Sequence, residues 1–139
     1  MSIALSCLIK LAMEARRCTV GFIFDQSLER VLLVHKGRPA WQAGKHNGVG
    51  GKVEPNESYR ACMVRECTEE TALEIPASAW VHFATITEPD ATIQCFTAVH
   101  HGDLGNALRA HPRLVVEDAT EMVAIREALV LVGQVRAAR

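Results

Sequence analysis

Short apolar runs in the first third of the chain are typical of β-strands. Thr19–Phe24 is apolar and rich in β-branched residues, and Val31–Val34 forms a second apolar run. Asp25–Arg30 lies between them and predicts a turn, so we expect the two runs to pair as a β-hairpin. Residues 35–56 are rich in glycine and contain two prolines, which predicts a long structured loop. Loops of this length in compact domains are usually functional.

The residues after this loop have the composition of a helix. Glu57–Thr71 contains no glycine or proline and is rich in residues that favour helices. Asn56 is a suitable N-cap, and the carboxylate of Glu57 would favour the positive end of the helix dipole. Pro76 marks the end of the element. We therefore predict one helix directly after the glycine-rich loop.

Two further strands and a loop are predicted beyond this helix. Val81–Thr87 and Ile93–Val99 have strand composition, and Glu88–Asp90 between them predicts a turn. His100–Asp118 is predicted to be mainly loop, with a short helical turn around Asn106–Ala110. These residues thus add a second hairpin to the predicted fold.

The end of the chain predicts a last strand at Glu121–Ile125 and a closing helix at Arg126–Arg139. Strands mixed with two or three helices indicate an α/β or α+β sandwich. We expect one domain over residues 18–139, preceded over residues 1–17 by an extension or an amphipathic segment. The apolar part of residues 1–17 is too short to span a membrane and contains Lys10.

Composition narrows the range of partners. The chain has 139 residues, of which 49% are hydrophobic and 22% charged, so a sizeable core is expected and disorder is not. The net charge is −1, whereas domains that grip nucleic-acid backbone usually carry a basic excess. An anionic small molecule remains compatible with this charge if a metal supplies positive charge.

Cysteine usage indicates a reducing compartment. The number of cysteines is odd and no pair has the spacing of zinc ligands, so we expect reduced thiols in a cytoplasmic protein. The five positions are Cys7, Cys18, Cys62, Cys67 and Cys95.

Three carboxylates in the predicted helix share one face. Glu66, Glu69 and Glu70 stand at positions i, i+3 and i+4. Like charges at this spacing repel one another by a few tenths of a kcal/mol per pair. A solvated helix face tolerates such repulsion, but a hard divalent cation would convert it into a binding site, because Mg²⁺ and Mn²⁺ prefer carboxylate oxygens.

Residues around these carboxylates favour the metal-site interpretation. Arg65 follows Glu57 by eight residues, slightly more than two helical turns, so the two side chains can pair and brace the helix. Upstream, Gly50 and Gly51 allow the backbone to approach a phosphate closely, and Lys52 adds a positive charge. A glycine-rich loop that leads directly into a helix with a carboxylate face is a stronger signal than either feature alone.

The stretch GKVEPNESYRACMVRECTEETAL over Gly51–Leu73 resembles the box of the Nudix hydrolase family, G-x5-E-x7-R-E-U-x-E-E-x-G-U, where U is bulky and aliphatic. Six fixed matches at one place have a chance probability of roughly 10⁻⁷ to 10⁻⁸, so coincidence is not a serious rival. Two positions depart from the pattern: Cys67 replaces an aliphatic residue and Ala72 replaces the glycine. The matching residues are Gly51, Glu57, Arg65, Glu66, Glu69, Glu70 and Leu73.

The resemblance implies the Nudix sandwich, in which a mixed β-sheet lies between helices. It also implies that Glu66, Glu69 and Glu70 ligate Mg²⁺ or Mn²⁺, with the Gly51 carbonyl as an extra ligand. Glu57 and Arg65 would support the helix. The expected reaction is hydrolysis of a diphosphate linkage, in which a dication neutralises phosphate oxygens and activates water. The general base stays open among several acids: Glu69, Glu70, Glu54, Glu117, Asp118 and Glu121.

The substrate also stays open. HNGVGGKVE over His46–Glu54 resembles the segment before the box in MutT-type hydrolases of oxidised purine triphosphates, in which an asparagine at the Asn47 position helps to recognise the base. Alternatively, Asn47 only caps the turn at Gly48. ADP-ribose or a nucleotide sugar is the rival substrate, because Pro89 lies roughly where ADP-ribose hydrolases of the family carry a proline, although Pro89 also suits a hairpin turn.

The loop also offers an aromatic residue and two cations that would stack a base or hold phosphates: Trp41, Lys36 and Arg38. Alternatively, Trp41 packs the loop and the two cations are solvated. The expected partner is a small nucleotide, with no nucleic acid and no membrane, and a homodimer is an open alternative to a monomer. The rival to an enzyme is a nucleotide-binding module of the same fold that has lost catalysis. The complete set of box carboxylates favours the enzyme.

Overall fold

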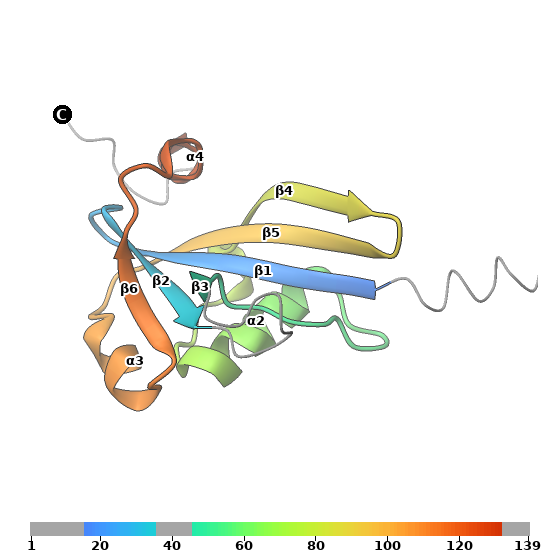
Figure 1. The fold of residues 1–139 in the computed structure, drawn as a ribbon, viewed down its shortest axis with the longest axis horizontal. Coiled ribbons are helices and arrows are strands. Elements are labelled where there is room, and N and C mark those ends of the chain that lie inside the picture. The colour runs from blue at the N-terminus through green and yellow to red at the C-terminus, as the bar shows by residue number, and fades with distance from the viewer. Residues whose placement is uncertain (1–15, 36–45, 132–139) are drawn as a thin grey trace, which may run out of the picture.

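The computed structural model describes residues 16–35 and 46–131. These residues form a six-stranded mixed sheet with helices on both faces, as Figure 1 shows. The strands follow the order β3-β2-β1-β5-β4, and β6 pairs with β2. Their bounds are Arg16–Asp25 (β1), Arg30–His35 (β2), His46–Asn47 (β3), Val81–Glu88 (β4), Ala91–His100 (β5) and Leu114–Asp118 (β6).

In the described residues, three α-helices and one short 3₁₀ helix accompany the sheet. In Figure 1, α2 lies on one side of the sheet and α4 on the other, while α3 lies beside β6. The expected sandwich with a mixed sheet between helices is therefore confirmed. The bounds are Tyr59–Thr71 (α2), Ala77–Ala79 (η2), Gly105–Ala110 (α3) and Val123–Leu131 (α4).

Both predicted hairpins are present. β1 pairs antiparallel with β2, and β4 pairs antiparallel with β5 across the turn after Glu88. β1 and β5 run parallel along their full lengths, from the pair Arg16 with Ala91 to the pair Asp25 with His100. Parallel pairing requires a long crossover, and α2 lies within it.

The glycine-rich loop runs along the part of β1 that does not pair with β2. Gly21 of β1 pairs with Val49, and Cys18 pairs with Lys52. The Thr19 N–H donates a 2.9 Å hydrogen bond to the Gly51 carbonyl. These bonds fix the backbone of residues 49–53 against the sheet, directly before α2 begins.

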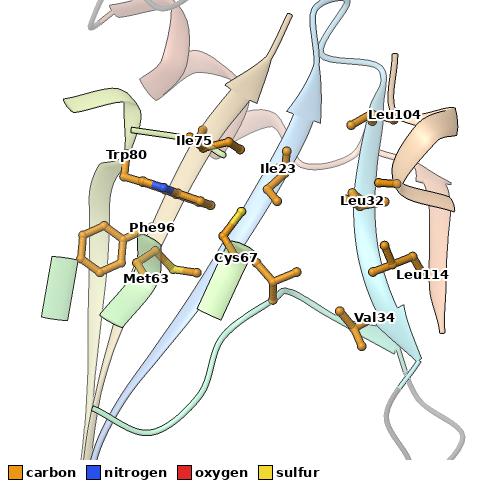
Figure 2. Packing of buried hydrophobic residues seen from close by; sticks show 13 residues of the cluster. Ile23, Leu32, Val34, Met63, Cys67, Ile75, Trp80, Phe96, Leu104 and Leu114 are labelled. Atoms are coloured by element: carbon orange, nitrogen blue, oxygen red, sulfur yellow. The ribbon is translucent and has the colours of Figure 1, made fainter. Parts of the chain in front are cut away.

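Each face of the sheet carries its own apolar core. The core under α2 and α3 includes Met63 and Cys67 of α2, which point toward Trp80 and Ile23 in Figure 2. Cys67 is completely buried, so its thiol fills the place of an aliphatic side chain. The core under α4 is built around Phe24, Val99 and Leu129.

The predicted start of the central helix was wrong, whereas its predicted last residue, Thr71, is confirmed. α2 begins after Ser58, whose side chain accepts a 3.0 Å hydrogen bond from the Ala61 N–H, so Ser58 and not Asn56 is the N-cap. Asn56 adopts a φ of 65° in the preceding turn, a conformation that asparagine tolerates better than most residues. Glu57 therefore lies outside the helix. The helix ends at Thr71, and Ala72, with a φ of 61°, is its C-cap, so the helix stops well before Pro76.

The C-terminal part of the fold also differs from the prediction. Leu114–Asp118 is strand β6 and not loop, because it adds to the free edge of β2. Glu121–Ile125 is not a strand, since helix α4 already begins at Val123. The helical turn predicted around Asn106–Ala110 is confirmed as α3.

Several expectations concern segments that the structure does not describe or describes in part. The extension over residues 1–17 lies outside the described residues up to residue 15, and Arg16 already belongs to β1. Within residues 16–35 and 46–131, no helix combines the length and the hydrophobicity needed to cross a membrane. The cysteines in these ranges are free thiols: Cys18, Cys62, Cys67 and Cys95.

Candidate active site

Arg65 and Glu57 form the predicted brace of the site. Arg65 Nε lies 2.8 Å from Glu57 Oε2, and Arg65 Nη2 lies 2.9 Å from Glu57 Oε1, which is a two-pronged ion pair. The hydrogen bonds from Arg65, together with one from the Glu54 backbone N–H, lower the pKa of Glu57 to about 2. These bonds raise the pKa of Arg65, so the pair stays charged over the whole physiological range.

Arg65 also holds two of the three box carboxylates. Its Nη1 lies 2.9 Å from Glu66 Oε1 and 3.3 Å from Glu69 Oε2. Its Nη2 donates a 3.2 Å hydrogen bond to the Lys52 carbonyl. One guanidinium group thus connects the α2 carboxylates to the glycine-rich loop.

The third carboxylate reaches the same loop. Glu70 Oε1 accepts a 2.9 Å hydrogen bond from the Gly50 N–H. Glu66 lies against Gly51 so closely that a Cβ atom at that position would be 2.5 Å from Glu66 Oε1. A side chain at Gly51 would therefore displace the Glu66 carboxylate, and a Cβ atom at Gly50 would meet the Thr19 carbonyl oxygen at 2.1 Å. The predicted common face of Glu66, Glu69 and Glu70 is turned toward this loop.

The donor chemistry of this face fits a hard dication. Carboxylate oxygens on one helix face are what Mg²⁺ and Mn²⁺ prefer. In the described part of the chain, however, no three acidic, histidine or cysteine side chains already converge as a metal site. Because Glu66 and Glu69 share Arg65 Nη1, a cation would have to compete with that nitrogen. Glu69 can turn, since 58% of its side chain is exposed. The Gly51 carbonyl accepts hydrogen bonds from the Thr19 N–H at 2.9 Å and from the Cys62 thiol at 3.8 Å, so a cation there would have to displace the weak thiol contact.

The residues predicted to bind substrate have different surroundings. Asn47 Oδ1 accepts a 2.8 Å hydrogen bond from the Gly48 N–H, as expected for the turn-capping alternative. Lys52 pairs with Cys18 through its backbone, and its side chain is exposed. Trp41, Lys36 and Arg38 lie outside the described residues.

The four other acids proposed as bases are spread over the molecule. Glu54 lies 3.9 Å from Arg65 Nη1 and so borders the site. Glu117 pairs with His46 at 3.1 Å. Asp118 pairs in register with Arg30 at the far end of β2, and its hydrogen bonds with Thr120 lower its pKa. Glu121 is exposed just before α4. Of these four, Glu54 alone contacts the Arg65 network.

A pocket of about 290 Å³ adjoins the box carboxylates. Glu69 and Glu70 form one part of its wall, and the turn between α3 and β6 forms another. This turn contributes His111 and Arg113, which the sequence interpretation missed because it treated the segment as loop. The available signal was the short apolar and β-branched run Leu114–Val116 after Pro112, which is typical of a strand. The full lining is Val34, Glu69, Glu70, His111, Pro112, Arg113 and Leu114.

A larger pocket of about 490 Å³ contains no box residue. It lies between the β1–β2 turn and the end of β6, and its lining is Glu29, Arg30, Val116, Glu117, Asp118 and Thr120. Pro89 occupies the turn between β4 and β5, so the hairpin alternative for this residue agrees with the fold.

Comparison with known proteins identifies the family. A model of the NUDIX domain matches residues 15–135. The chain is 35% identical over 82 residues to the CTP pyrophosphohydrolase of Escherichia coli (strain K12), and the match covers 59% of this chain and 60% of that protein. The chain therefore spans about three fifths of this relative's length. The family match and this relative support the expectation of a pyrophosphohydrolase.

Solved structures support the fold. A MutT/nudix family protein from Enterococcus faecalis aligns with a TM-score of 0.60 and 16% identity, over 85% of this chain and 51% of that one. NrtR from Shewanella oneidensis, solved with a 27mer DNA, aligns with a TM-score of 0.66 and 16% identity, over 82% of this chain and 62% of that one. Identities this low establish the shared fold alone. With the domain match over residues 15–135 and the box residues gathered at one loop, the chain belongs to the Nudix family.

Proposed function

We propose that the chain is a hydrolase, dependent on Mg²⁺ or Mn²⁺, that cleaves a diphosphate linkage in a nucleoside triphosphate. The observation that carries this proposal is the position of the box carboxylates. Glu66 and Glu70 contact the adjacent loop residues Gly51 and Gly50, while Glu69 shares Arg65 with Glu66. Three acids held beside a glycine-rich backbone suit a metal-assisted reaction on phosphates.

Glu66, Glu69 and Glu70 would hold the dication, with the Gly51 carbonyl as a further oxygen donor. The dication would supply neutralisation of phosphate oxygens and activation of water. Arg65 keeps the carboxylates in place through its pair with Glu57. The absence of side chains at Gly50 and Gly51 lets a phosphate approach the backbone. Glu54, 64% exposed at the edge of this network and before α2, is a further candidate base.

Nucleoside triphosphates are the favoured substrate class. The relative from Escherichia coli is a CTP pyrophosphohydrolase, so CTP is the first substrate to test. Water would add to one phosphorus and the bridging P–O bond would break, which gives CMP and pyrophosphate from CTP. Asn47 is engaged with Gly48 and Pro89 lies in a hairpin turn, so neither residue adds support for an oxidised purine or for ADP-ribose.

A hydrolysis screen with Mg²⁺ tests the proposal. It compares the four common ribonucleoside triphosphates, oxidised purine triphosphates, ADP-ribose and dinucleoside polyphosphates. We expect turnover of a triphosphate with release of pyrophosphate and monophosphate. A variant carrying Glu69→Gln and Glu70→Gln serves as the matched inactive control. Preferential hydrolysis of ADP-ribose would instead indicate a nucleotide-sugar hydrolase. Undiminished turnover in the control variant would reject Glu69 and Glu70 as metal ligands.

The non-catalytic binding module is the second candidate function. The likeness to NrtR concerns the fold, and the net charge of −1 does not favour contact with DNA. All three glutamates of the box are present, which favours catalysis. A nucleotide that binds tightly yet stays intact for hours with Mn²⁺ would support the binding module. A location in the cytoplasm and a homodimeric state remain predictions.

A further inference from the structure

The turn between α3 and β6 contributes His111 and Arg113 to the lining of the pocket that Glu69 and Glu70 border. We propose that this turn, His111–Leu114, is the phosphate-binding wall of the active site and that Arg113 binds the terminal diphosphate of the substrate. The inference rests on the proposed function, because it takes a nucleoside triphosphate as the substrate.

Three backbone hydrogen bonds hold this turn: one to α3, one to β2 and one within the turn itself. The His111 N–H donates to the Ala107 carbonyl at 3.1 Å, and the Leu114 N–H donates to the His111 carbonyl at 3.1 Å. The His35 N–H of β2 donates to the Arg113 carbonyl at 2.7 Å. The backbone that carries the Arg113 side chain is therefore fixed by both a helix and the sheet. Because this backbone is already ordered, less conformational entropy is lost when the side chain binds a ligand.

The Arg113 side chain has no ion-pair or hydrogen-bond partner among the described residues. Arg65, by contrast, is surrounded by carboxylates, and Arg109 lies 3.8 Å from Asp103. In the pocket, Arg113 shares the wall with the carboxylates that would hold the dication. A group that bridges a dication and a guanidinium group must be anionic. A diphosphate is anionic and can bind both cations at once. A neutral nucleobase would leave the charge of Arg113 uncompensated.

The size and floor of the pocket agree with a diphosphate. Pockets that enclose a whole drug-sized ligand run from about 300 to 1,000 Å³, so a pocket of about 290 Å³ suits a part of a nucleotide. Val34 and Leu114, both largely buried, supply an apolar floor. Arg113 itself is exposed, so its guanidinium group is accessible to a phosphate that arrives from solvent.

Steady-state kinetics of Arg113→Gln test this inference, with Arg109→Gln as the matched control. Arg109 lies on α3, its side chain is 69% exposed, and it does not line the pocket. For Arg113→Gln we expect KM to rise roughly tenfold or more, equally for CTP, UTP, ATP and GTP, with a smaller change in kcat. The inhibition constant of inorganic pyrophosphate should rise by the same factor. Arg113→Lys should recover part of the loss, and Arg109→Gln should behave as the wild type.

Two results would overturn the inference. Unchanged KM and pyrophosphate inhibition in Arg113→Gln would remove Arg113 from the site. A KM increase that differs strongly between bases would assign the pocket to the nucleobase. If the wild type hydrolyses no triphosphate, the proposed function fails, and calorimetric binding of pyrophosphate with Mg²⁺ then tests the wall alone. Weaker pyrophosphate binding by folded Arg113→Gln or Arg113→Lys than by the wild type would support the proposed phosphate-binding wall. Equal binding would reject it.

Discussion

The two faces of the sheet share an apolar core but differ in what surrounds it. On the α4 face, Phe24, Val31 and Leu129 pack together, and the polar groups nearby make local turn contacts. On the α2 face, a comparable core is bordered by the Arg65 network and the glycine-rich loop. Both faces therefore contribute to packing, but the residues of the proposed chemistry lie on the α2 face alone. Substitutions on the two faces should therefore have different effects.

The largest expected effect falls on the α2 face. Glu69→Gln combined with Glu70→Gln should reduce kcat/KM by about 10³-fold or more, because the proposed metal contribution is worth several kcal/mol. Stability should change by less than about 0.5 kcal/mol, since glutamine can still accept the Gly50 hydrogen bond and like-charge repulsion is relieved. Urea unfolding and kinetics on the same preparation measure both quantities. A large loss of stability would show that the carboxylates of the α2 face also support the fold, which would contradict the proposed difference between the faces.

The converse effect is expected on the α4 face. Leu129 is completely buried, so Leu129→Ala should lower the free energy of unfolding by about 2–5 kcal/mol. At temperatures well below unfolding, kcat/KM should stay near the wild-type value. Val123→Ala provides the control on the same helix, because Val123 is 52% exposed and its truncation should cost little. Loss of activity in folded Leu129→Ala would show that the faces are coupled.

The pH dependence of stability should report on the brace. Because Arg65 lowers the pKa of Glu57 from 4.5 to about 2, the ionised carboxylate stabilises the folded state. This stabilisation is complete above the unfolded pKa and is lost as the pH falls from 4.5 toward 2. Glu57→Gln should therefore melt below the wild type at neutral pH, and the difference in Tm should shrink in that acidic window. A difference that does not depend on pH would exclude the ion pair as its cause.

The smallest effect concerns the end of α2. Ala72 adopts a left-handed conformation, with a φ of 61°, at the position where the family pattern has glycine. Ala72→Gly should raise the free energy of unfolding by about 1 kcal/mol, because glycine lacks the Cβ that makes this conformation unfavourable. Kinetic constants should not change. Chemical denaturation of the two proteins provides the comparison, and a destabilised glycine variant would contradict this account of the helix end.

The sequence predicted the α2 region well because its signals are local. The spacing of Arg65 and the three box glutamates determines which side chains share a face of α2, whereas Glu57 reaches Arg65 from the segment just before the helix. The N-cap was misplaced by two residues because Asn56 and Ser58 are both good caps, and only the turn conformation distinguishes them.

The region from β6 to α4 was predicted poorly because its structure depends on distant residues. Leu114–Asp118 becomes a strand by pairing with β2, which lies about eighty residues earlier in the chain, as the pair Leu114 with Val34 illustrates. The same pairing brings Arg113 beside the α2 carboxylates. No local pattern around Arg113 could reveal this neighbourhood, so a part of the candidate site was outside the reach of the sequence.

Manganese bound to the protein offers the most direct test of the central claim, that Glu66, Glu69 and Glu70 hold a dication together. Anomalous diffraction from crystals grown with Mn²⁺ and a slowly hydrolysed triphosphate analogue would locate the ion. We predict a peak with carboxylate oxygens of at least two of the three glutamates at about 2.0–2.3 Å, close to Mg²⁺ distances. An ion bound elsewhere, with the three carboxylates still engaged by Arg65 and Gly50, would contradict the account.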